Sequence, residues 1–539
     1  FDARWRYAAG VGSYDCDGWT RFAHTVLVDM RARLAASKDP RRIFDVTVEA
    51  AGAAGLIGAK RVLDSTPLYD AVATMDTITL VRSAIRALLK VACPEEEVAL
   101  RALLRSGDDY ATSGKPQIDW DDKEAREALV DSRAKDGFAL LAHLDGAELD
   151  PLVADAARLL ATVLGQDLEE AGDGVFRIAR RVAKDRVIST VDPEARHGHK
   201  TSARGFDGYK GHAAIDPDSE IVTDTVVSAG NAGDASVAEE LIDDLLCDDA
   251  PPDEANGQPE PRGAEAPVIP GEDEGPTEGA DTTAATVPAA RRGGGGASRG
   301  RRDKAGRRAQ RAARHGAKNT ARRLAAREAG RSKDRASCDV SKKMATPAPT
   351  ERPRVYGDAA YGAGAFLDHL ARNDIDSFCK TQPPVAPSGR FAKDRFTIDL
   401  DADQVTCPAG VTVGIARDAK GDGIAHFATA CAGCPLRDQC TTAKGGRTIQ
   451  VGRYEHRLAE ARREQQEAAW KDEYRATRPK VERKLGHMMF RKHGGRRARV
   501  RGRTKVDADF NLLAAAQNLA RLATLGLRSG GGTWEVAGA

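Results

Sequence analysis

The first part of the chain spaces its apolar side chains three or four positions apart. This repeat runs through 19–37 and 40–57 and is typical of amphipathic helices, because it places the apolar residues on one face. The pattern changes at 60–71, where the short apolar run KRVLDSTPLYDA contains Asp-Ser-Thr-Pro. Such a run predicts a strand that enters a turn. We therefore expect a helical region followed by a first strand.

Helical spacing returns from 77 to 184 and predicts an all-α segment. A helix is also expected at 234–246, with Asp234 as its N-cap residue. Between these helical parts, three short runs have the composition of strands: 186–192, 208–216 and 220–230. This order predicts that an all-α insertion precedes a group of strands.

Low-complexity sequence fills residues 250–350. The acidic, Pro- and Gly-rich part at 251–283 cannot bury a core, and we expect it to be disordered. The basic part at 291–333 could form a helix, but it lacks a large apolar face. Regular patterns resume with a strand, a loop and a helix at 354–375, followed by another strand at 376–382.

The C-terminal part predicts a long helix from 460 to about 491 and a last helix from 510 to 525. The net charge of the chain is only +2, but basic residues concentrate at 291–333 and 480–503. Basic blocks within a balanced total favour a polyanionic partner, with a solvated arginine-rich surface as the alternative.

Length and composition narrow the class of protein. A chain of 539 residues, 41% apolar and 30% charged, predicts a globular protein of two or three domains. The sequence contains neither a run of about 18 apolar residues nor a signal peptide, which excludes a membrane-spanning protein and favours the cytoplasm. The chain starts at Phe1 in the middle of a pattern, and we expect upstream residues to be missing.

The nine cysteines are unevenly distributed. An odd total with one tight cluster favours a metal site in a reduced compartment over a disulfide framework. The cluster contains a Cys-x₂-Cys pair typical of a zinc knuckle, in which four thiolates complete a tetrahedral structural site. Buried, unpaired thiols are the alternative, and His426 is a weaker candidate ligand. The clustered residues are Cys407, Cys431, Cys434 and Cys440.

Three acidic residues carry the candidate chemistry. Asp64 and Asp358 each follow a short apolar run, so we expect both at strand ends, where α/β sheets bind ligands. Glu482 is expected on a helix. Tyr474 and Arg478 precede it in four-residue steps and would share its face. For each acid taken alone, a turn or a helix cap is the alternative.

The motifs and their order resemble DDE transposases of bacterial insertion sequences. The resemblance covers most of residues 1–527 outside the low-complexity segment. It implies an α/β fold, a ribonuclease-H-like mixed sheet flanked by helices, with an N-terminal helical domain, an all-α insertion and a cysteine-rich insertion. The matching segments are VLDSTPLYDA, DPEARHGHKTSARGFDGYKGHAAID with DTVVSAGNAGD, VYGDAAYGAGAF, YRATRPKVERKLG and GRTKVDADFNLLAAAQNLARL.

This resemblance implies DNA cleavage and strand transfer by a two-metal mechanism. Asp64, Asp358 and Glu482 would bind two Mg²⁺ ions, or Mn²⁺ in their place, and the cysteine cluster could hold a structural Zn²⁺. The implied partner is double-stranded DNA with terminal inverted repeats, bound by a homodimer in the cytoplasm at the nucleoid. The expected DNA contacts are Tyr474, Arg478, Arg491, Lys492, Arg496 and Arg497.

Asp192 is the alternative first acid, since it also ends an apolar run. We favour Asp64, because Asp-Ser-Thr matches the first-acid motif of the family and DPEAR matches a segment downstream of it. His212 is expected on a strand, where it packs or contacts DNA. GGGG at 293–296 lacks the strand and helix of a nucleotide-binding loop.

Three other functions compete with the transposase. They are a nuclease without strand transfer, an inactive or truncated transposase-derived DNA-binding protein, and a zinc-dependent structural DNA-binding protein. The three acids favour the enzyme, whereas the start at Phe1 and the long 250–352 segment favour inactivity.

The expected organisation divides the chain into nine parts. These are the N-terminal helical domain of DNA-binding type (1–60), the first catalytic strand (61–73), the helical insertion (74–185), the core strands and helix (186–249), the low-complexity insertion (250–352), the second-Asp strand (353–400), the cysteine-rich insertion (401–450), the C-terminal core helices (451–527) and a tail (528–539).

Overall fold

A computed structural model describes most of the chain. The described residues are 24–70, 74–112, 116, 118–201, 204–246, 352–490, 494–530 and 533–536. The low-complexity segment, the first 23 residues and two expected DNA contacts, Arg491 and Lys492, lie outside them. No helix in the described part is long and apolar enough to cross a membrane.

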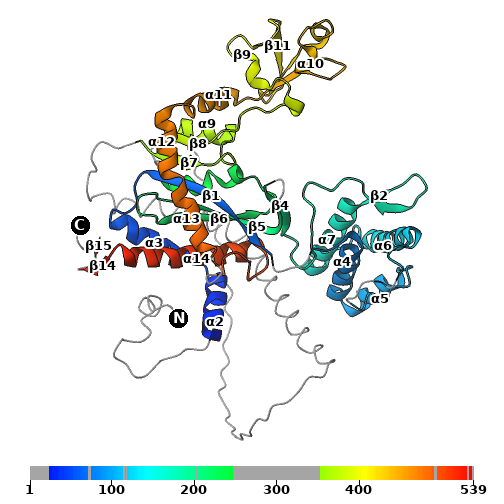
Figure 1. Cartoon of the computed structure of the whole chain (residues 1–539). Helices are drawn as coiled ribbons and strands as arrows, with labels where there is room; N and C mark the ends of the chain where they lie inside the picture. The colour runs from blue at the N-terminus through cyan, green and yellow to red at the C-terminus, as the bar shows by residue number, and fades with distance from the viewer. Residues whose placement is uncertain are drawn as a thin grey trace, which may run out of the picture. The chain divides into compact units, whose positions relative to one another are not determined.

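A six-stranded mixed sheet is central to the fold (Figure 1). Its order is β4-β5-β1-β7-β8, and β6 also pairs with β5. β1 runs antiparallel to β5 and parallel to β7, which is parallel to β8. The strands are β1 (Lys60–Tyr69), β4 (Arg196–Thr201), β5 (Arg204–Ile215), β6 (Val222–Ala229), β7 (Arg354–Gly357) and β8 (Asp376–Cys379).

Helices cover both faces of this sheet. One face buries Val62 and Tyr356 of the sheet against α13 (Pro479–Met488) and α14 (Arg503–Thr524). The other face packs against α9 (Gly364–Arg372) and the 3₁₀-helix η2 (Glu240–Leu245). A mixed sheet flanked by helices is consistent with the ribonuclease-H-like fold that the resemblance implied.

The N-terminal helices are α2 (His24–Ala36) and α3 (Arg42–Ala53). Phe44 of α3 is buried in the same core as Val62 of β1, and α3 also packs on α14. The described part of the expected N-terminal domain therefore shares the core of the sheet.

The helical insertion has a hydrophobic core of its own. Three of its helices begin at aspartates, Asp76, Asp122 and Asp150, whose side chains accept a hydrogen bond from a backbone N–H of the first turn. Where 77–184 was predicted helical throughout, residues after Asp167 form a short hairpin. The elements are α4 (Thr77–Val91), α5 (Pro94–Ala102), α6 (Lys123–Leu144), α7 (Pro151–Asp167), β2 (Leu168–Glu170) and β3 (Phe176–Ile178).

A five-stranded antiparallel sheet, which was not predicted, occupies the cysteine-rich region. Its order is β13-β12-β11-β10-β9, and it encloses a small hydrophobic core. The elements of this region are η3 (Pro387–Gly389), η4 (Lys393–Arg395), β9 (Thr397–Asp399), β10 (Gln404–Thr406), β11 (Thr412–Arg417), β12 (Gly423–His426), η5 (Ala428–Cys431), α10 (Arg437–Cys440) and β13 (Thr448–Val451).

The long C-terminal helix that was predicted is divided into three, α11 (Glu455–Glu464), α12 (Ala468–Thr477) and α13. Glu467 is extended, with φ −65° and ψ 141°, and separates α11 from α12. The last helix, α14, begins at Arg503 rather than at 510. It is followed by a hairpin of β14 (Leu527–Gly530) and β15 (Thr533–Val536).

Two local predictions before the low-complexity segment were wrong. Residues 186–192 form no strand, and β4 begins only at Arg196. The expected helix at 234–246 consists of two 3₁₀ turns, η1 (Asp234–Val237) and η2. Asp234 does not cap it, because its carboxylate is engaged by Lys210 and Ser65 instead.

Candidate active site

Asp64 and Asp358 belong to adjacent parallel strands. Val62 of β1 pairs with Tyr356 of β7, and each acid follows its strand's paired residue by two positions. Asp358 directly follows the last residue of β7, as predicted. The pairing therefore places the two acids at the same level along the sheet.

Asp64 does not end its strand, which corrects the prediction. β1 continues to Tyr69, but its ladder with β7 stops at Val62. Within the described residues, the next partner on that side is Arg497, opposite Tyr69. Pro67 suits this unpaired edge, because proline has no N–H to donate to a neighbouring strand. The pairing of β1 with β7 therefore stops two residues before Asp64.

The guanidinium of Arg478 contacts all three predicted acids. Its Nη2 lies 3.0 Å from Asp64 Oδ1 and 3.9 Å from Asp358 Oδ2. Its Nη1 lies 3.4 Å from Glu482 Oε1. Strand β1, the end of β7 and helix α13 thus converge on one cation, although their acids are far apart in the sequence.

The four side chains form a gradient from buried to exposed. The side chain of Arg478 is 6% exposed and that of Asp64 is 15% exposed, whereas Asp358 is 46% and Glu482 is 64% exposed. A buried guanidinium is stable only when it is paired. Asp64 is therefore its innermost partner, and the other two carboxylates face the solvent.

Arg478 joins α12 to α13. Its φ of −57° and ψ of −38° are helical, and its N–H donates to the carbonyl of Tyr474 at 2.9 Å. Pro479 is tolerated as the first residue of α13, since that position has no intrahelical N–H bond to lose. Val481 and Leu485 anchor α13 in the core, which fixes Glu482 near Arg478.

Burial and charge act in opposite directions on these groups. Burial is the largest effect on Asp64 and raises its pKa, the Arg478 guanidinium opposes this rise, and the negative charge of Asp358 adds to it. Burial lowers the pKa of Arg478, but its acidic neighbours more than compensate, so that this pKa is raised. The site therefore keeps its cation charged.

The donor set fits hard divalent cations, because Mg²⁺ and Mn²⁺ prefer carboxylate oxygen. With the side chains as described, no group of three or more His, Cys, Asp or Glu residues lies close enough together to hold a metal ion. The three acids here are grouped around Arg478, which lies between them. Loading a metal would therefore require this guanidinium to move.

A buried polar network next to Asp64 was not predicted from the sequence. Ser65 Oγ donates to Asp234 Oδ2 at 2.5 Å, and Lys210 Nζ lies 2.8 Å from Asp234 Oδ1. The Lys210 and Asp234 side chains are only 15% and 8% exposed. The network ties β1 to β5 beside Asp64. One feature of the sequence could have indicated this network. Lys210 lies two residues before His212 on a predicted strand, so the two side chains were expected on the same face of the sheet.

His212 is fully buried on β5, which confirms packing and rules out a direct DNA contact. Its Nε2 lies 2.8 Å from Ser228 Oγ, and its Nδ1 lies 3.2 Å from Tyr361 Oη. Burial lowers the pKa of His212 to about 4, so the ring is neutral near pH 7.

Asp192, the alternative first acid, is buried away from Arg478's ion pairs. It accepts a hydrogen bond from Tyr209 Oη at 2.7 Å and from the Gly502 N–H at 3.1 Å. These bonds tie the loop before β4 to β5 and to the start of α14. The geometry favours Asp64 over Asp192 as the first acid.

The described DNA-contact candidates lie in different surroundings. Tyr474 stacks on Trp470 with ring centroids 4.9 Å apart, and Lys380 Nζ lies 5.3 Å from its ring centroid. Arg496 and Arg497 are exposed, and their backbone meets Tyr69 at the far end of β1. Tyr69 is roughly 17 Å along the strand from Asp64, at about 3.3 Å per residue.

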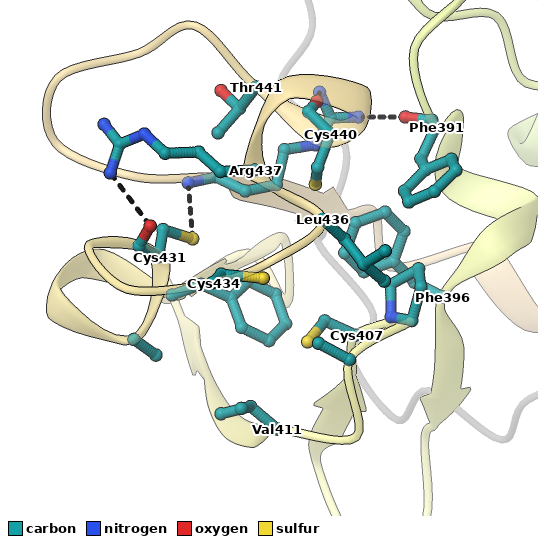
Figure 2. Close-up of a pocket in the computed structure, with 15 residues that line it drawn as sticks. Phe391, Phe396, Cys407, Val411, Cys431, Cys434, Leu436, Arg437, Cys440 and Thr441 are labelled. Atoms are coloured by element: carbon teal, nitrogen blue, oxygen red, sulfur yellow. Dashed lines mark hydrogen bonds between the residues drawn. The ribbon is translucent and has the colours of Figure 1, made fainter.

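The four clustered cysteines line one pocket of the small antiparallel sheet (Figure 2). Cys431 and Cys440 are buried. The backbone N–H of Arg447 donates to Cys431 Sγ at 3.4 Å. Burial is the largest effect on Cys440 and raises its pKa, the charge of Arg447 opposes this rise, and the neighbouring cysteines add to it. Thiolate sulfur is the ligand that soft metal ions prefer, so the residue types fit such an ion. Within the described residues, however, the four sulfurs do not lie close enough together to form a metal-binding group. The candidate His426 is exposed and pairs weakly with Thr448.

Two models of the transposase DDE domain match the chain, one over residues 179–250 and one over residues 406–523. The first match includes Lys210 and Asp234, and the second includes the cysteine cluster, Arg478 and Glu482. None of the curated proteins and none of the solved structures matches.

Proposed function

From the two domain matches, which identify the chain as a relative of the DDE transposases, we propose that it cleaves DNA ends and transfers the cut strands. Asp64, Asp358 and Glu482 form the active site in this proposal. The observation that carries it is their convergence on the single guanidinium of Arg478. Its substrate would be double-stranded DNA with terminal inverted repeats, bound by a homodimer at the nucleoid.

Two Mg²⁺ ions, or Mn²⁺ in their place, would supply the Lewis acidity that phosphodiester cleavage and strand transfer require. The protein orients the carboxylates for them. The Ser65 N–H donates to Asp64 Oδ1 at 2.8 Å, and the Ala360 N–H donates to Asp358 Oδ1 at 2.9 Å. One oxygen of each aspartate is thereby held by a backbone N–H, and this bond fixes the orientation of the carboxylate.

Basic and aromatic groups would bind the DNA in this proposal. Tyr474 and Arg478 would contact phosphate near the scissile bond, and Arg496 and Arg497 would bind the duplex farther along. Arginine suits phosphate because its fork donates two parallel hydrogen bonds. Contacts of this kind position DNA without reading its sequence.

Cleavage of labelled duplexes from the inverted repeats that flank the gene tests the proposal. The Asp358→Asn variant should lose at least 100-fold in cleavage rate, roughly the cost of removing one transition-state electrostatic group. Asp472→Asn is the matched control, since Asp472 is an exposed acid of α12. Equal cleavage by Asp358→Asn and the parent protein would refute the active site. Cleavage without joining would identify a nuclease instead.

We also propose that Cys407, Cys431, Cys434 and Cys440 hold one structural Zn²⁺. The support is their common pocket, the N–H···S bond to Cys431 and the preference of soft metal ions for thiolate sulfur. Such a metal would stabilise the small sheet, as closed four-thiolate sites do.

A further inference from the structure

We infer that Arg478 competes with divalent cations for Asp64, Asp358 and Glu482, and that the ions displace its guanidinium toward DNA. Metal binding would thereby free Arg478 to bind a DNA phosphate. The inference rests on the proposed function, because it assumes that the three acids are the metal ligands.

The contacts require this competition. Arg478 Nη2 lies 3.0 Å from Asp64 Oδ1 and also approaches Asp358. Mg²⁺ binds carboxylate oxygen at about 2.0–2.1 Å and demands near-octahedral geometry. An ion held by these oxygens would lie within a few ångströms of the guanidinium, where two positive charges repel strongly at low exposure to solvent. The arginine and the metal cannot both occupy the space between the acids.

Charge also favours the exchange. Three carboxylates carry three negative charges, of which one guanidinium neutralises one. Two divalent ions would neutralise all three and leave the site attractive to a phosphate. Arg478 already has one unsatisfied group, since its buried Nε has no hydrogen-bond partner among the described residues. A phosphate accepts bonds from such a fork in parallel. The guanidinium therefore gains partners when it moves to DNA.

The coupling must be reciprocal. If metal binding frees Arg478 for DNA, then DNA that captures Arg478 must raise metal affinity by the same factor. The protein would bind metal more tightly on its substrate than alone, which favours loading of the site in the DNA complex.

Calorimetric titration of Mn²⁺ into the DNA-free full-length protein tests the competition. The Arg478→Gln variant should bind Mn²⁺ at least fivefold more tightly than the parent protein, within the usual range of coupling between sites. Arg475→Gln is the control, because Arg475 is an exposed arginine on α12, one turn away. Its Mn²⁺ affinity should match that of the parent. Equal or weaker binding by Arg478→Gln would overturn the inference.

Two further measurements separate the inference from the proposed function. Mn²⁺ should raise the melting temperature of Arg478→Gln more than that of the parent, which remains measurable if the variant is destabilised. Adding Asp358→Asn to Arg478→Gln should abolish the tight binding. If Asp358→Asn weakens Mn²⁺ binding while Arg478→Gln alone binds like the parent, only the competition fails. If Asp358→Asn changes Mn²⁺ binding in neither background, the proposed metal site itself fails.

Discussion

Asp234 is an enclosed charge whose removal should cost stability. It is bonded to Lys210 and Ser65, and its side chain is 8% exposed. Replacing it with Ala leaves the Lys210 ammonium buried without its counter-ion, which typically costs about 3–5 kcal/mol. Urea unfolding of Asp234→Ala and the parent protein measures this loss.

A double-mutant cycle isolates the pair. Lys210→Met alone leaves the Asp234 carboxylate unpaired and should also destabilise. In the Asp234→Ala/Lys210→Met variant neither charge remains, so the combined loss should be smaller than the sum of the single losses. Strictly additive losses would mean that the two side chains do not interact.

His212 should make stability depend on pH. Its pKa is about 4 in the folded protein, below the ordinary 6.5, because the ring is buried. Between these values the unfolded chain binds a proton that the folded chain does not. Stability should therefore fall by up to ~3 kcal/mol as the pH drops from 6.5 to 4. Unfolding curves of His212→Gln should lack this contribution. Parallel curves for variant and parent would contradict it.

Residues of the site differ in how far sequence could predict them. Asp64, Asp358 and Glu482 follow ordered motifs, so their grouping could be expected before the fold was known. Asp234 could not, because its local pattern is that of a helix N-cap, whereas its partners Lys210 and Ser65 come from distant strands. The tertiary contacts with Lys210 and Ser65, rather than the local sequence, thus determine the role of the Asp234 carboxylate.

At the scale of elements, the packing of α14 on β5 depends on a glycine. A β-carbon at Gly211 would lie 2.8 Å from Phe510 Cζ. Gly211→Ala should push α14 from the sheet and destabilise the protein by about 1–3 kcal/mol, as overpacked cores do. Gly165→Ala in α7 is the control, since its β-carbon would meet nothing within 4 Å, and the change should be neutral or stabilising. Thermal unfolding compares the two, and equal melting temperatures would refute the contact.

Element prediction succeeded where periodicity was long and failed where elements were short. The helices α4, α6, α7 and α14 were all expected, because each repeats its apolar spacing over several turns. β9 and β10 have three residues each, too few for alternation to be recognised. The break between α11 and α12 was missed for a different reason. The polar residues there are compatible with a helix, and no proline or glycine near Glu467 indicates that its backbone is extended.

At the scale of the whole molecule, the chain has two groups of potential metal ligands that differ in chemistry. Carboxylates gather around Arg478, and thiols gather in the small antiparallel sheet. Hard and soft ligands select different ions. The order of motifs indicated both groups and predicted the three acids together, whereas their contacts with Arg478 followed only from the register of β1 with β7 and the path of α13.

Removing the metal proposed at the thiols should therefore leave the carboxylate group around Arg478 unaffected. Titrating the protein with a thiol-reactive mercurial should release one equivalent of Zn²⁺, detected by a colorimetric chelator, and should lower the melting temperature. The Cys431→Ser variant should release less than one equivalent, while Cys93→Ser, at an exposed cysteine outside the cluster, should release the full amount.

Because the carboxylates share no ligand with the thiols, Mn²⁺ binding by the Arg478→Gln variant should survive zinc removal in any protein that stays folded. Loss of both together would mean that the small sheet supports the active site, and no zinc release from the parent would refute the thiolate site.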